Sequence, residues 1–187
     1  MDCAASVFYA RVAMATRWST GLASLLELLE RVASDLGLRV EEPGGVRPPE
    51  GFDWVRDVVS ETPVARVALR VFGSESGRLV LAMPVGFAQQ HRALLAGLPV
   101  EERVAFISRL LYTLAMVCPV CRLGLGGEPV NPEGVVAEIH YVSAPDAQRL
   151  ADDIIRLFNV YLLVNAMIWE KFPGAATPGQ ATSTMYT

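Results

Sequence analysis

Two cysteines carry the most suggestive chemistry in the chain, because Cys118 and Cys121 stand in a Cys-Pro-Val-Cys motif. Pairs at this spacing serve as thiol–disulfide centres or supply two ligands of a zinc site. A reactive thiol is favoured at the N-terminal end of a helix, where the helix dipole stabilises the thiolate. A long helix that starts near Val100 and ends before Pro119 is predicted, so both thiols lie at its negative end. This position disfavours thioredoxin-like exchange.

A zinc site at this motif would need two further ligands. The other cysteine and the two histidines of the chain are Cys3, His91 and His140. Cys3 belongs to a predicted N-terminal extension, and His140 lies on the polar side of a predicted strand. We therefore interpret Cys118 and Cys121 as small apolar residues at a helix-to-strand corner, either free or joined in a disulfide. Metal or redox chemistry at this pair stays as the alternative function.

No other group of residues predicts catalysis. The neighbouring acids Glu101–Glu102 and Asp152–Asp153 lie in predicted helices, where adjacent side chains point about 100° apart and do not converge on one substrate. The glycines of residues 124–127 lead into a strand, whereas a phosphate-binding loop leads into a helix. We predict no catalytic and no cofactor-binding residues. An enzyme remains a third hypothesis, and its site would use the strand face with Arg66, Arg70, Glu138 and His140.

Composition excludes several classes of protein. Hydrophobic residues make up 52% of the 187-residue chain, which predicts a folded core. The net charge of −4 and the scattered arginines disfavour nucleic-acid binding, which needs a basic surface. No apolar stretch reaches the roughly 20 residues of a membrane helix. Residues 1–17 carry Asp2 where a signal peptide has positive charge, so we expect a cytoplasmic protein.

The elements that must position these residues follow from hydrophobic periodicity. Helices are predicted from Ser19 or Thr20 to Gly37, over 89–96, from Val100 to a point before Pro119, and from Ser143 to Phe172. Strands are predicted over 54–59, 64–72, 79–83, 122–126 and 135–142. The order α-β-β-β-α-β-β-α indicates an α+β fold, an antiparallel sheet with helices on one face. We divide the chain into an N-terminal extension (1–17), a single domain (18–172) and a flexible tail (173–187).

The last helix has apolar residues all round. From Leu157 to Trp169 it contains no charged residue. A helix of this kind must be covered on most of its circumference. We expect its own domain to cover one side and a second copy of the chain to cover the other. The predicted dimer interface consists of Leu157, Tyr161, Val164, Asn165, Ile168 and Trp169.

Three stretches of the sequence resemble an archaeal family of uncharacterised proteins whose fold is similar to type III secretion chaperones and to YbjN-like proteins. They are residues 84–96, LPVEERVAFISRLLYTL from Leu98, and DAQRLADDIIRLFNVYLLV from Asp146. The resemblance covers residues 19–172 and implies a chaperone-like domain that dimerises. It implies no catalytic residues.

The function that we expect is that of a non-enzymatic, homodimeric protein-interaction module. The last helix would serve self-association, and a sheet or helix surface would bind a peptide or protein segment as a chaperone does. No cofactor, no metal, no nucleic acid and no membrane is expected as a partner.

Overall fold

Helix α2 (Leu25–Asp35) opens the described part of the chain. A computed structural model describes residues 24–62 and 65–173. The Ser24 hydroxyl accepts a hydrogen bond from the Glu27 backbone amide, and the Glu27 carboxylate accepts one from the Ser24 amide. This reciprocal capping box fixes the start of the helix. The predicted extension over residues 1–17, the predicted helix start at Ser19 or Thr20 and residues 174–187 of the predicted tail lie outside the described residues.

Six antiparallel strands form one sheet in the order β1-β2-β3-β4-β6-β5. Their bounds are Arg39–Glu41 (β1), Trp54–Thr62 (β2), Ala65–Gly73 (β3), Leu79–Gly86 (β4), Arg122–Glu128 (β5) and Asn131–Tyr141 (β6). Strands β2, β3 and β4 follow one another in space as in sequence, whereas β6 inserts between β4 and β5. A bulge interrupts the β5–β6 pairing between Gly126 and Gly127, and its extra residue lies in β6.

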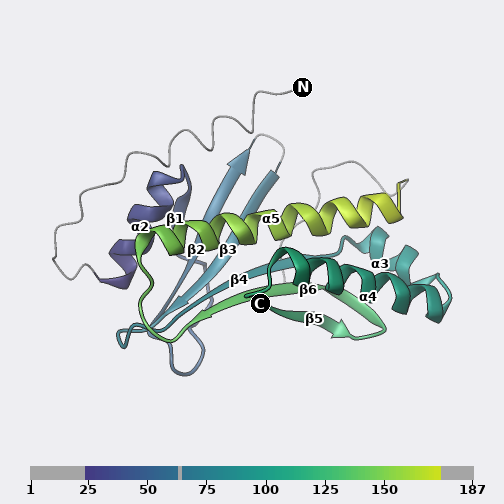
Figure 1. Ribbon diagram of the computed structural model, residues 1–187, viewed down its shortest axis with the longest axis horizontal. Helices are drawn as coiled ribbons and strands as arrows, with labels where there is room; N and C mark the ends of the chain where they lie inside the picture. The colour runs from purple at the N-terminus through teal and green to yellow at the C-terminus, as the bar shows by residue number, and fades with distance from the viewer. Residues whose placement is uncertain (1–23, 63–64, 174–187) are drawn as a thin grey trace.

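Three further helices lie with α2 on one face of this sheet. They are α3 (Gln89–Ala96), α4 (Val100–Val117) and α5 (Ala147–Lys171). Figure 1 shows α5 running across the sheet, with α4 packed beside it and α2 near its N-terminal end. The core fills the space between the two layers. It takes Leu69 from β3, Leu81 from β4, Leu110 from α4 and Leu157 from α5, all without exposed surface. The predicted α+β architecture is confirmed.

Local details differ from the sequence prediction at three points. Strand β1 was not predicted, because three residues are too few to show an alternating pattern. Helix α5 begins at Ala147, and its N-cap is Asp146, which accepts a hydrogen bond from the Arg149 amide at 2.8 Å. The predicted cap at Ser143 is therefore wrong. Val100 and Val104 have the helical spacing of the buried residues of α4, yet both are exposed.

The opposite face of the sheet is partly apolar as well. Strand β4 is buried on both faces from Leu79 to Val85. On the side without the core cluster, Ala82 lies between Arg70 of β3 and Glu138 of β6 in the strand register. The small Ala82 side chain thus has a charged residue on each side, Arg70 and Glu138. On the strand face that the enzyme hypothesis selected, Arg66 is exposed, whereas the Arg70 side chain is largely buried.

Candidate functional site

The predicted interface residues of α5 fall on two sides of the helix. Leu157, Val164 and Ile168 are buried in the core of the same subunit, so they cannot contact a partner. Tyr161, Asn165 and Trp169 are half-buried. The residues of α5 that face outward instead are Asn159, Leu162 and Ala166. Helix α2, helix α4 and the sheet all pack against α5. Its own domain therefore covers a larger part of its circumference than the sequence analysis predicted.

Asn165 and Trp169 were predicted to lie in the dimer interface. In the structure Asn165 Nδ2 donates a hydrogen bond to the Tyr161 backbone oxygen at 2.8 Å, within the same helix. Trp169 packs edge-on against the His91 ring, with 5.0 Å between the ring centroids. These contacts explain how a polar amide and a large ring are accommodated without a second subunit.

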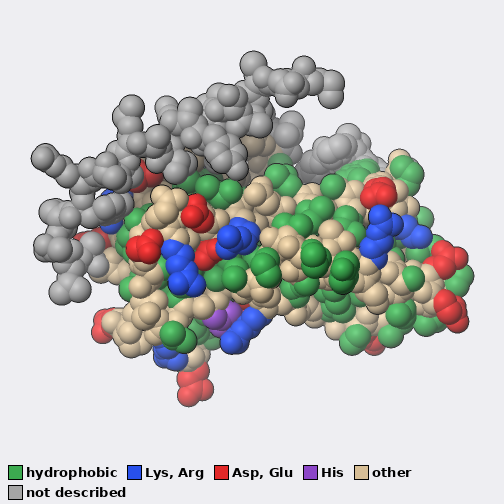
Figure 2. All heavy atoms as spheres, viewed as in Figure 1, with side chains coloured by type: hydrophobic (Ala, Val, Ile, Leu, Met, Phe, Trp, Pro, Cys, Tyr) green, Lys and Arg blue, Asp and Glu red, His purple; other side chains and the backbone are tan. Residues whose placement is uncertain are grey.

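An exposed apolar surface lies on α4 and on the outer side of α5. Tyr112 is 70% exposed, Met116 is 67% exposed and Leu162 is 63% exposed. We call these three residues the α4–α5 surface. Figure 2 shows apolar side chains gathered over the two neighbouring helices, with charged groups mainly at the two ends of this face. Tyrosine and methionine are typical of protein interfaces, because they offer large contact areas and adaptable packing.

Ion pairs hold the two helices of this surface together. Arg109 of α4 lies 3.9 Å from Glu170 of α5, and Lys171 of α5 lies 3.9 Å from Glu102 of α4. Exposed pairs of this kind contribute little to stability, but they place charge around the apolar residues. An apolar centre with a charged rim is the usual composition of a protein-binding surface.

A second polar cluster joins β6 to α5. The Tyr141 hydroxyl donates a hydrogen bond to the Asp153 carboxylate, and Arg156 Nη1 donates to the other oxygen of the same carboxylate. Both Tyr141 and Asp153 are buried. Burial, and then the hydrogen bond to Asp153, raise the pKa of Tyr141 well above its ordinary value of 10.0, so the hydroxyl stays protonated. The cluster clamps the first turns of α5 to the sheet.

An open groove of about 620 Å³ lies next to this clamp. It is lined by both acidic and basic side chains, among them Asp146, Arg149, Asp152, Asp153 and Arg156. The Arg149 guanidinium also stacks over the Tyr141 ring. The Asp153 carboxylate accepts hydrogen bonds from Tyr141 and Arg156 within the fold, so we assign it a structural role. The predicted separation of Asp152 from Asp153 holds, since Asp152 is exposed and Asp153 is buried.

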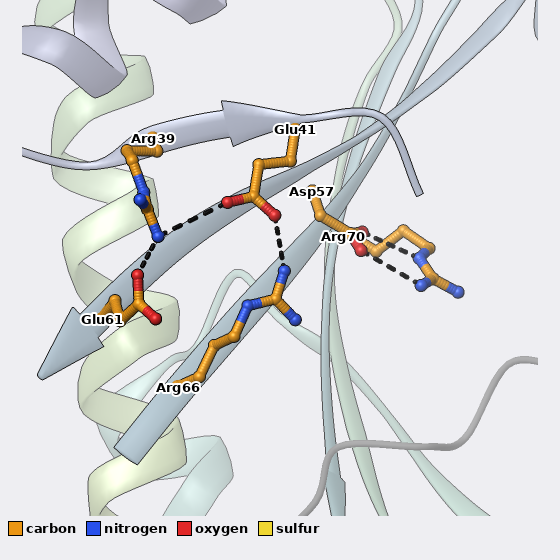
Figure 3. Close-up of polar contacts among 6 residues, drawn as sticks. All are labelled: Arg39, Glu41, Asp57, Glu61, Arg66 and Arg70. Carbon is orange, nitrogen blue, oxygen red and sulfur yellow. Dashed lines mark hydrogen bonds and ion pairs between the residues drawn. The ribbon is translucent and has the colours of Figure 1, made fainter. Parts of the chain in front are cut away.

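The strand face that the enzyme hypothesis selected carries a set of internal ion pairs. Figure 3 shows Arg39, Glu41, Glu61 and Arg66 linked across β1, β2 and β3. Next to them, Arg70 donates from Nε to Asp57 Oδ1 at 3.0 Å and from Nη2 to Asp57 Oδ2 at 3.3 Å.

Glu138 and His140 lie on the same face, and His140 Nε2 is 2.8 Å from Glu138 Oε2. The register places Glu138 opposite Ala82, which itself lies opposite Arg70, so one strand separates Glu138 from Arg70. Each of these charged groups therefore has a neighbour of opposite charge or a hydrogen-bonding partner within the sheet. The four residues that the sequence analysis assigned to one strand face do share it, and they are paired within the sheet.

Cys118 and Cys121 are joined in a disulfide, with 5.3 Å between their Cα atoms. Cys118 ends α4 and is buried, and Cys121 directly precedes β5 and is half-buried. The predicted helix-to-strand corner is confirmed. No three potential metal ligands come together within residues 24–62 and 65–173. Cys3, the third cysteine, lies outside the described ranges.

His91 and the remaining acids have structural surroundings. The His91 ring is buried in α3 and stacks with Phe172 at 6.3 Å between centroids. Glu101 and Glu102 are exposed in the first turn of α4, where negative charge is favourable next to the helix dipole. The α4–α5 surface itself was not predicted. Its signal in the sequence is that Tyr112 and Met116 are apolar, four residues apart, and off the buried stripe of their helix.

Comparison with known proteins gives a family and a fold. Residues 25–168 match the model of a family described as "Uncharacterized conserved protein (DUF2299)". The structure is similar to the crystal structure of an uncharacterized protein from Methanothermobacter thermautotrophicus, with a TM-score of 0.65 and 19% sequence identity. The similarity covers 79% of this chain and 99% of that chain, and at this identity it shows the fold alone. None of the curated proteins compared with the chain matches it. No helix of the described ranges has the length and apolarity to span a membrane.

Proposed function

The chain belongs to the DUF2299 family of uncharacterized conserved proteins, and we propose that it is a self-associating module that binds a protein or peptide segment. The observation that carries this proposal is the α4–α5 surface, where Tyr112, Met116 and Leu162 are each more than 60% exposed. Large apolar side chains grouped on one face of a folded protein mark an interaction site. Burying one such side chain contributes about 1.5–3 kcal/mol to binding.

We propose binding, and not catalysis, as the activity of this surface. The buried carboxylates of the described residues are engaged within the fold, Asp153 with Tyr141 and Arg156, and Asp57 with Arg70. A chaperone-like use of the fold is part of the proposal. Its support is the layer of helices that presents a flexible methionine and a tyrosine beside each other, a combination that can pack against varied apolar sequences.

The test is the binding of an unfolded polypeptide to the α4–α5 surface. Fluorescence anisotropy with labelled, reduced and carboxymethylated α-lactalbumin, which stays unfolded, should give saturable binding in the micromolar range. Met116→Asp and Leu162→Asp should each weaken it at least tenfold, because a charge would have to be buried in the contact. Val142→Asp is the matched control, since Val142 is 89% exposed in a different region at the end of β6.

Two outcomes of this experiment would contradict the proposal. One is the absence of saturable binding by the natural chain. The other is an equal loss of binding in Val142→Asp, which would show that the apolar residues of α4 and α5 have no special part in the contact.

A redox role of Cys118 and Cys121 is a second candidate, favoured by their disulfide. We propose that reduction frees the half-buried Cys121 while Cys118 stays covered. Equilibration in glutathione buffers of graded ratio, followed by thiol labelling and mass spectrometry, measures the reduction potential. A potential below that of the glutathione pool would identify a structural disulfide and remove this candidate.

A further inference from the structure

Strand β5 (Arg122–Glu128) forms one end of the sheet and pairs only with β6 among the described strands. An edge strand presents backbone N–H and C=O groups that can pair with another chain. Natural proteins protect such edges with lysine, proline, inward charges or bulges. The interior of β5 reads Leu-Gly-Leu-Gly-Gly and contains no charge or proline, and the extra residue of the bulge at Gly126–Gly127 lies in β6. A Cβ atom built on Gly124 would meet nothing within 4 Å, so the outer face of the strand is open.

The charges at the two ends of β5 are complementary to each other. Arg122 opens the strand and Glu128 closes it, and both are exposed. If two copies of β5 pair antiparallel about Leu125, Arg122 lies opposite the partner subunit's Glu128, and the reverse pair forms by symmetry. A shift of the register by two residues would place Arg122 opposite the partner's Gly126 or Val130. The charges therefore favour a single register, as opposite charges in cross-strand pairs do.

The side chains of β5 also suit a twofold axis perpendicular to the sheet. Leu123 and Leu125 pack against the core on the helix side of the sheet. Antiparallel pairing about Leu125 keeps the helices of both subunits on the same side and brings the two Leu125 side chains together. A twofold contact of this kind uses the same patch in both subunits and closes upon itself.

Helix α4 offers a mainly uncharged flank above this edge, with Glu101 at its N-terminal end. Glu102 and Arg109 point toward α5, as their ion pairs show. Residues two positions further along a helix lie about 200° round, so Val104 and Leu111 face away from α5, toward the side of β5. Val104 is 46% exposed, and Leu111 is half-buried. The small residues Ser108 and Ala115 lie on the same flank, and small residues permit close approach of two helices.

We propose that two copies of the chain join through their β5 edges, in the register that pairs Arg122 with the partner's Glu128, with the Val104–Leu111 flanks of α4 packed above. The six strands of each subunit would then form one continuous sheet. This inference rests on the self-association in the proposed function and specifies its surface. The α4–α5 surface lies on other sides of α4 and stays accessible, so dimer formation and polypeptide binding can be measured separately.

A charge exchange tests this register. In sedimentation velocity at low ionic strength, the natural chain should be a dimer at micromolar concentration. Arg122→Glu and Glu128→Arg should each raise the dimer dissociation constant at least tenfold, because each places two like-charged pairs across the twofold axis. The double variant Arg122→Glu/Glu128→Arg should return within about threefold of the natural value, since it restores both pairs. Arg47→Glu and Glu50→Arg, at exposed loop positions, are matched controls that should change nothing.

Hydrogen exchange gives a second measurement that does not depend on charge. Amides of β5 should become more protected as the protein concentration rises through the dimer dissociation constant, whereas amides of β1 at the other end of the sheet should not. Single variants as dimeric as the natural chain, a double variant that stays dissociated, or β5 protection independent of concentration would each overturn the inference. Polypeptide binding at Met116 could persist in every one of these cases, so the proposed function would be judged separately.

Discussion

Tyr141 and Asp153 form a buried hydrogen bond that links strand β6 to helix α5. The register places Tyr141 opposite Leu79, so the contact lies where β4 begins and β6 ends. This single contact therefore couples the helix layer, through Asp153, to two neighbouring strands. Several measurable properties of the protein depend on it and on similar contacts.

Tyr141→Phe should lower the free energy of unfolding by about 1–3 kcal/mol, because it leaves a buried carboxylate with one hydrogen bond fewer. Urea denaturation followed by circular dichroism measures the change. Tyr112→Phe is the matched control and should alter stability by less than about 0.5 kcal/mol, since Tyr112 is exposed. Equal stability of the two variants would show that the Asp153 carboxylate does not need the Tyr141 hydroxyl.

Alkaline pH should destabilise the protein through the same tyrosine. The pKa of Tyr141 is raised in the folded state, mainly by burial and then by Asp153, so above pH 10 the unfolded chain loses a proton that the folded chain keeps. The free energy of unfolding should then fall as pH rises, by up to about 1.4 kcal/mol per pH unit from this group.

Urea denaturation between pH 8 and pH 11 measures this slope in the natural chain and in Tyr141→Phe. Tyr161 contributes in the same direction, because burial also raises its pKa. Tyr161→Phe therefore serves as a comparison that retains the Tyr141 component. The explanation fails if Tyr141→Phe loses stability with pH as steeply as the natural chain.

Asp57→Asn should be strongly destabilising, by about 3–5 kcal/mol, because it breaks a largely buried ion pair and leaves the Arg70 charge less compensated. Glu61→Gln breaks the exposed pair with Arg39 in the same region and should cost less than about 1 kcal/mol. Guanidinium is unsuitable as denaturant here because it screens charge, so thermal and urea unfolding are the measurements. Similar losses in the two variants would mean that burial does not decide the contribution of these pairs.

Reduction of the disulfide should have a small effect on stability. The loop between Cys118 and Cys121 is so short that loop closure accounts for about 2 kcal/mol. Urea denaturation with and without a phosphine reductant should show a decrease of this size. Cys118→Ala/Cys121→Ala should behave as the reduced protein does and should no longer respond to reductant. A much larger loss on reduction would indicate that the disulfide holds the α4–β5 corner in place.

Periodicity predicted the fold of this chain well because its main elements are long and regular. Strand β6 alternates from Val135 to Tyr141, and α4 carries Ile107, Leu110 and Leu114 at helical spacing, so their types could be predicted from the residues. Strand β1 could not be predicted, since three residues next to a proline- and glycine-rich loop carry no period.

The interaction surface was harder to predict than the fold. The apolar residues of α5 encircle the helix, and sequence alone does not show which of them its own subunit covers. Leu157 and Val164 are enclosed, while Leu162 is exposed, and this difference depends on the positions of α2, α4 and the sheet. The same limit applies to Asp153, whose burial follows from the approach of Tyr141 and not from the charge of its neighbours in the sequence.

The insertion of β6 between β4 and β5 has a consequence for how the chain reaches its native state. The β2–β3–β4 meander and the β5–β6 hairpin each connect neighbours in sequence and can form quickly, whereas Leu79 and Tyr141 meet only after a long intervening stretch has closed. We therefore expect the pairing of β4 with β6 to limit the rate of folding.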